Sequence, residues 1–134
     1  MTKHPRPNEV PPHATPISTR LGWLAITLAP LLWPLPGLAA KTADCRVEAE
    51  GRVAFAGKCQ FVADTGGSFS LTSLDNQSPL YGSTLSVSVS VVSPGNAEVR
   101  GLTKSGINSR WGSAIRSRGE PACWVGEDFR VCAR

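Results

Sequence analysis

Four cysteines are the residues of this 134-residue chain whose chemistry is easiest to identify. Cysteine side chains form disulfides in oxidising compartments, whereas in reducing ones they bind metals or act as redox centres and nucleophiles. The spacing within this set does not include the CxxC pattern of a zinc knuckle or a redox motif. The even number therefore favours two disulfides over a metal site. The cysteines are Cys45, Cys59, Cys123 and Cys132.

Three connectivities are possible for four cysteines, and the expected strands favour the pairing of neighbours in sequence. In the first hairpin we expect Cys45 directly opposite Cys59, with Glu50 facing Ala54 across a three-residue loop. Directly opposed residues on adjacent strands have Cβ separations that suit a disulfide.

The last hairpin is expected to follow the same rule. Cys123 would lie directly opposite Cys132, with Gly126 facing Phe129 across the two-residue loop formed by residues 127–128. Both predicted disulfides thus bridge a hairpin, one near each end of the domain.

The positions of the histidines exclude several kinds of catalysis. The chain has two, His4 and His13, and both lie in a segment that we expect to be removed. The remaining chain would then lack the base of a Ser-His-Asp or Cys-His system and the usual ligand of a catalytic zinc. We therefore predict no enzyme activity, no metal and no cofactor. A cell-wall hydrolase that uses two carboxylates stays open as an alternative.

The C-terminal third is basic and contains the candidate binding residues. From residue 103 onward six basic residues oppose three acidic ones. Residues 105–119 are rich in Gly, Ser and Arg, so we expect an irregular basic loop that contacts an acidic protein, an envelope polymer or lipid headgroups. The net charge of +2 over residues 41–134, eleven basic residues against nine acidic, argues against nucleic acid. The candidate residues are Arg110, Trp111, Arg116 and Arg118.

The first 40 residues have the pattern of a secretory signal peptide with a helical apolar core. Residues 1–20 are polar, basic and proline-containing, and residues 21–40 (LGWLAITLAPLLWPLPGLAA) carry no charge. Small residues at Gly37 and Ala39 favour cleavage before Ala40, and cleavage one residue later is the alternative. This leader predicts a periplasmic or secreted protein.

An uncleaved leader would instead anchor the protein in the inner membrane, and only then would we expect a membrane partner. Twenty apolar residues just span a hydrocarbon layer of about 30 Å as a helix. However, Pro30, Pro34 and Pro36 interrupt helical hydrogen bonding in the second half of the stretch.

Residues 41–134 predict one mostly β domain, either a small antiparallel barrel or a sandwich. From Thr84 to Val92, Leu or Val alternates with Ser, which is typical of a half-buried strand. Turn residues recur at short intervals, and no helical period is sustained. The other expected strands are 46–49, 53–56, 68–74, 97–102, 122–125 and 129–133.

Both ends of this domain carry a recognisable set of residues. The front reads Cys45-Arg46-Val47-Glu48, Gly57-Lys58-Cys59 and Gly67-Ser68-Phe69-Ser70, and the end reads Ala122-Cys123-Trp124 and Cys132-Ala133. This set resembles a family of small exported bacterial proteins with no assigned function. The resemblance implies export, two disulfides and a β fold over nearly all of residues 41–134. It brings no catalytic residue, and this chain has Ser109, Arg110 and Trp111 where relatives carry histidines.

The function we predict is that of a non-enzymatic envelope protein, a disulfide-stabilised β module that binds or supports other components. A periplasmic lysozyme inhibitor is the alternative. Such inhibitors are also small, disulfide-linked β domains, and they insert polar loop residues into the lysozyme cleft. Loop 105–118 is similar to theirs only in this general character.

Overall fold

The folded domain begins at Ala40. The computed structural model describes residues 29–30 and 40–134. The predicted signal peptide, apart from residues 29–30 and 40, lies outside the described residues. In the described part of the chain, no helix has the length and apolar character needed to cross a membrane.

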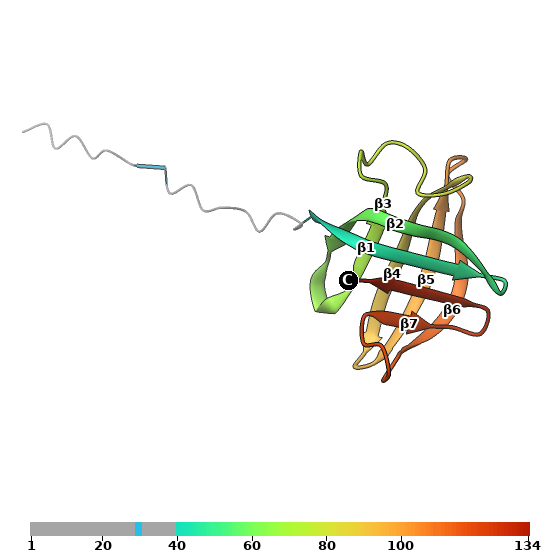
Figure 1. The fold of residues 1–134 in the computed structure, drawn as a ribbon. Helices are drawn as coiled ribbons and strands as arrows, with labels where there is room; N and C mark the ends of the chain where they lie inside the picture. The colour runs from blue at the N-terminus through green and yellow to red at the C-terminus, as the bar shows by residue number, and fades with distance from the viewer. Residues whose placement is uncertain (1–28, 31–39) are drawn as a thin grey trace, which may run out of the picture. The chain divides into compact units, whose positions relative to one another are not determined.

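Eight antiparallel strands form a closed barrel (Figure 1). Each strand pairs with the next one in sequence, and the last strand pairs with the first. This closure decides between the two expected architectures in favour of the barrel. The one helical segment among the described residues is a single 3-10 turn, η1 (Thr65–Gly67). The strands are β1 (Ala40–Ala49), β2 (Arg52–Ala63), β3 (Phe69–Thr72), β4 (Thr84–Ser93), β5 (Asn96–Thr103), β6 (Asn108–Arg116), β7 (Cys123–Val125) and β8 (Phe129–Ala133).

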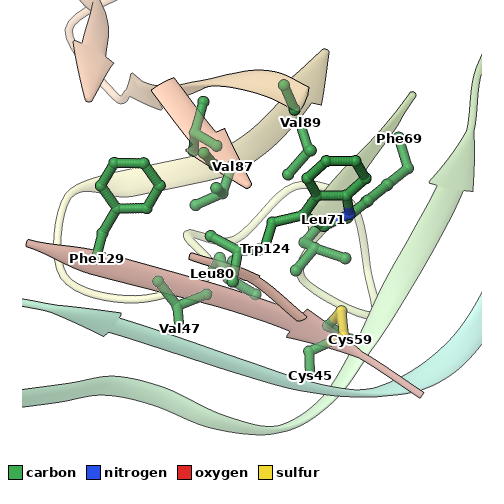
Figure 2. Close-up of a cluster of buried hydrophobic side chains, with 14 of the residues drawn as sticks. Cys45, Val47, Cys59, Phe69, Leu71, Leu80, Val87, Val89, Trp124 and Phe129 are labelled. Carbon is green, nitrogen blue, oxygen red and sulfur yellow. A yellow bond between two sulfur atoms is a disulfide. The ribbon is translucent and has the colours of Figure 1, made fainter. Parts of the chain in front are cut away.

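Alternating side chains from all eight strands fill the barrel interior. In β4, Val87 and Val89 are at most 1% exposed, and the serines next to them in sequence face outward, as the alternation predicts. Figure 2 shows these valines packed with Leu71 and Trp124 inside the barrel. An eight-stranded barrel is just wide enough for side chains to fill. Sites for a partner must therefore lie at its ends or on its outer surface.

The first hairpin has the predicted disulfide but not the predicted register. Cys45 and Cys59 are bonded, whereas Cys45 lies opposite Gly57 and Cys59 lies opposite Ala43. The two cysteines are therefore diagonal neighbours on the inner face, with Cα atoms 5.8 Å apart. The connectivity is confirmed, and the expectation of a directly opposed pair is wrong.

The turn between β1 and β2, together with a bulge that leaves Ala54 without a partner in β1, explains this difference. Glu50 and Gly51 have φ angles of 52° and 73°, and Ala49 pairs with Arg52 around them. Two consecutive residues with positive φ are typical of the two-residue hairpin turn whose twist matches that of the strands. The predicted three-residue loop with Glu50 facing Ala54 is therefore wrong, because the tighter turn fits the twisted hairpin better.

The last hairpin confirms its predicted register. Cys123 lies directly opposite Cys132 and is bonded to it, with Cα atoms 4.0 Å apart. The N–H of Gly126 donates to the carbonyl of Phe129 at 2.9 Å. Trp124 packs in the core, so alternation places this second disulfide on the outer side of the wall.

The segment expected to be an irregular loop contains a strand instead. β6 covers nine residues and pairs with β5 along its length. A register shift between Val99 and Arg100 inserts Trp111 as an extra residue of β6. This bulge breaks the period-two pattern, which is why the sequence alone does not show the strand.

Two disulfides and no free cysteine indicate a domain that folds in an oxidising environment.

We predict that C45A/C59A and C123A/C132A each lower the free energy of unfolding by about 2–3 kcal/mol. The first pair should cost more, because its sulfurs also pack in the core. Urea denaturation of the oxidised variants measures both changes, and an unchanged midpoint for either variant would contradict this role.

Candidate functional site

The basic residues of the barrel divide into those with a carboxylate partner and those without one. Seven have a carboxylate oxygen at 2.6–3.8 Å. Among the described residues, four make no such ion pair, and three of these lie at one end of the barrel, where β1 begins and β6 ends. We call this the basic end. Its unpaired cations are Lys41, Arg116 and Arg118, whereas the fourth, Lys104, lies at the opposite end.

A cavity of about 180 Å³ opens at the basic end, and we call it the basic mouth. Aromatic rings and cations line it, and no carboxylate side chain does. The lining residues that matter here are Lys41, Phe61, Phe69, Arg116, Trp124 and Arg134. Of these, Arg134 is already paired with Glu120, at 3.1 Å.

Strand alternation points two of the cations into the mouth. Lys41 is on the same face of β1 as Ala43, and Arg116 is on the same face of β6 as Ala114. Both alanines belong to the core. Because each cation occupies the end of its strand, its aliphatic stem can cover the core while its charge reaches solvent.

The aromatic rings hold these cations in place. The Lys41 Nζ lies 5.3 Å from the centre of the Phe61 ring, which stacks on Phe69 with centroids 4.8 Å apart. The Arg116 guanidinium lies 5.7 Å from the Trp124 ring. Cations are attracted to the negative faces of aromatic rings at such distances. The mouth is therefore a preformed arrangement of positive charge on an apolar floor.

One hydrogen bond orients the Arg116 guanidinium and leaves its other N–H donors free. Its Nε–H donates to the carbonyl of Pro121 at 2.7 Å. No other hydrogen bond from this guanidinium to the described residues is present, so its remaining donors can bind a carboxylate or phosphate. Chemically, the mouth can bind an anionic group that carries an apolar body.

The structure does not bring the four predicted binding residues together. Arg116 and Arg118 lie at the basic end, but Arg110 and Trp111 lie about 16–20 Å further along β6, given the rise of a strand. The four residues therefore lie near the two ends of one strand and not in a single basic loop.

Arg110 is engaged on the outer surface. Its Nε–H donates to Glu98 at 2.8 Å, and Arg100 reaches the same carboxylate oxygen at 3.2 Å. The hydrogen bond from Arg110 holds the pKa of Glu98 below its ordinary value, and the same bond raises the pKa of Arg110. Arg110 thus has a structural partner already.

Trp111 closes the other end of the core. Its ring contacts Phe129 edge to face, with centroids 5.8 Å apart, and packs against the buried core. It lies over Gly101, where a Cβ atom would be only 2.8 Å from the indole Nε1. The bulge turns this side chain inward, so Trp111 packs against the core and is only partly exposed.

Sequence reasoning missed Lys41, Phe61 and Phe69 as site residues. They lie far from Arg116 in sequence, and barrel closure brings them to the same end. One signal was present: Lys41 has the same strand parity as the buried Ala43 and Cys45, which marks it as an inward-facing charge.

One cluster of potential metal ligands is present among the described residues, on the outer side of the barrel. Glu120 lies near Cys123 and Cys132, with its Oε2 atom 3.1 Å from the Cys123 sulfur. The two sulfurs are bonded to each other, so neither is a thiolate. Only the carboxylate remains as a metal ligand, and Arg130 and Arg134 already surround it.

The strongly shifted carboxyl group of Asp75 has a local structural role. Hydrogen bonds from the Ser78 hydroxyl, the backbone N–H groups of Gln77 and Ser78, and the Ser73 hydroxyl keep its pKa well below the ordinary value. These bonds shape the connection between β3 and β4, at the end of the barrel opposite the basic mouth.

Comparison of the chain with protein-family models, curated proteins and solved structures finds no match. The chemistry assigned to the basic mouth therefore depends on its own residues and their geometry.

The contact between Trp111 and Gly101 gives a test of the closed end. Gly101→Ala should lower the free energy of unfolding by about 1–3 kcal/mol, because the added methyl group overlaps the indole. Gly119→Ala is the matched control, since nothing lies within 4 Å of its Cβ position. Thermal unfolding of both variants measures the difference, and equal stabilities would show that Trp111 does not pack as described.

Proposed function

We propose that this protein is an exported, non-enzymatic binding module that takes an anionic amphipathic ligand at its basic mouth. The ligand presents a carboxylate or phosphate to Lys41 and Arg116 and lays its apolar part on the aromatic rings. One observation carries the proposal: three unpaired cations gather at one end of a barrel that pairs nearly all its others.

Electrostatic repulsion among the unpaired cations supports the proposal of an anionic ligand. Neighbouring cations repel one another, and the repulsion increases where protein excludes water. The barrel neutralises its other arginines with carboxylates but places none in the lining of the mouth. A ligand anion would supply the missing negative charge and would form charge-assisted hydrogen bonds.

Export is the second part of the proposal. The basic segment followed by uncharged residues 21–40 supports a cleaved signal peptide and a periplasmic or secreted domain. The two disulfides favour such an oxidising compartment.

Octanoate and octyl phosphate are suitable probes of the mouth, with octanol as the uncharged control. We expect both anions, but not octanol, to shift the NMR signals of Lys41 and the Trp124 indole. Lys41→Met and Arg116→Met should each weaken binding about tenfold or more, because each removes a charged hydrogen-bond donor.

Lys104→Met is the matched control, since it removes an unpaired cation from the opposite end. Its affinity for octanoate should equal that of the wild type. If Lys104→Met and Lys41→Met behave alike, or if octanol binds as well as octanoate, the mouth is not an anion site.

Intact mass spectrometry of the exported protein tests the compartment. We expect a chain that begins at Ala40 and is about 4 Da lighter than the reduced chain, because each disulfide removes two hydrogen atoms. A full-length chain recovered from the cytosol with four alkylatable thiols would contradict export.

A further inference from the structure

We infer that the basic end of the barrel docks on the surface of a bilayer that contains anionic phospholipid. This inference rests on the proposed function, because the basic mouth would receive a lipid phosphate. From the sequence, a membrane partner was expected through an uncleaved leader, and lipid headgroups were one of three candidate contacts of the predicted basic loop. The folded domain offers a separate route that needs no anchor.

The two most exposed large hydrophobic side chains of the described residues lie at this end. Val92 is 69% exposed and Ile115 is 66% exposed. Both strands end here, and Asn96 of β5 pairs with Ile115 on one side and with Ser93 on the other. The irregularity between Val91 and Ser93 leaves Val92 outside the ladder. Two aliphatic side chains thus flank the start of β5.

A second, wider hollow extends from Ile115 toward the basic mouth. It has a volume of about 670 Å³, and Ile115, Arg118 and Pro94 contribute to its lining. It shares Arg116 and Pro121 with the mouth, so the two hollows adjoin at these residues. No acidic side chain lines either of them.

The acidic side chains near this end are already engaged. Asp64 accepts a hydrogen bond from the backbone N–H of Thr65 at 2.7 Å. Glu120 is paired with Arg130 and Arg134, at 3.5 and 3.1 Å. Among the described residues, Asp64 makes no ion pair and keeps its charge, so the basic end presents three unpaired cations against one unpaired carboxylate side chain, and its net unpaired side-chain charge is positive.

Peripheral binding to an anionic membrane uses this combination of groups. Cations are attracted to the lipid phosphates, and aliphatic side chains enter the boundary between headgroups and acyl chains. The same charge argues against a second copy of this chain as the occupant, because two basic ends would repel each other. The aliphatic side chains beside the cations favour a bilayer over a purely ionic partner.

Vesicle cosedimentation of the exported, oxidised protein tests the inference. We expect binding to vesicles of equal parts phosphatidylglycerol and phosphatidylcholine, little binding to phosphatidylcholine alone, and loss of binding in 0.5 M salt, in keeping with strong screening. Arg118→Glu should reduce partitioning by about fivefold or more. Ile115→Ser should reduce it by removing the inserted side chain.

Matched controls exist at the opposite end of the barrel. Lys104→Glu makes the same charge change as Arg118→Glu, and Ile107→Ser makes the same polarity change at a side chain that is 60% exposed. Both controls should bind like the wild type. Urea midpoints equal to that of the wild type would show that all four variants are folded.

Absence of binding to the anionic vesicles, or equal losses from the control and test variants, would overturn membrane docking. Octanoate binding measured in parallel separates the two proposals. If octanoate binds and the vesicles do not, only the docking inference fails. If neither binds, the proposed function fails with it.

Discussion

The pairing of β1 with β8 is the interaction on which the rest of this structure depends. Asp44 and Arg134 exchange backbone hydrogen bonds of 2.8 and 2.9 Å, and Cys45 lies opposite Ala133. This seam removes both free edges of the sheet, which would otherwise expose unpaired N–H and C=O groups. It also gives every strand one inner face, so that a single core of aliphatic and aromatic side chains can form. Without the seam, the domain would be an open meander with two unpaired edges.

Each strand of the seam belongs to a hairpin closed by a disulfide. Cys45–Cys59 joins β1 to β2, and Cys123–Cys132 joins β7 to β8. The first lies within the core (Figure 2), and the second lies on the outer side of the wall under the carboxylate of Glu120. The covalent constraints therefore act on the two hairpins that must meet. Closing each hairpin reduces the conformational entropy of the unfolded chain near its two ends.

The seam also creates the functional surface that we propose. Lys41, at the start of the first strand, reaches the same cavity as Trp124 of β7 and Arg116 of β6. The cations fall into two groups. Most of them form ion pairs on the outer wall with carboxylates such as Glu98 and Glu48, and those at the basic end remain available to bind an anion. A rigid barrel holds these groups in position before a ligand arrives, so little ordering entropy is lost on binding.

Local patterns in the sequence determined the β class, the strand at Thr84–Val92, both disulfide connectivities and the register of the last hairpin. The reason is that side-chain period, cysteine spacing and turn composition act between near neighbours in the chain. The tertiary structure decided the barrel, the strand hidden by the bulge at Trp111, and the separation of Arg110 from Arg116. These features depend on hydrogen bonds and packing between segments far apart in the chain, and no local pattern encodes which strand closes on which. The basic mouth belongs to this second group, since its cations become neighbours only when the first strand meets the last.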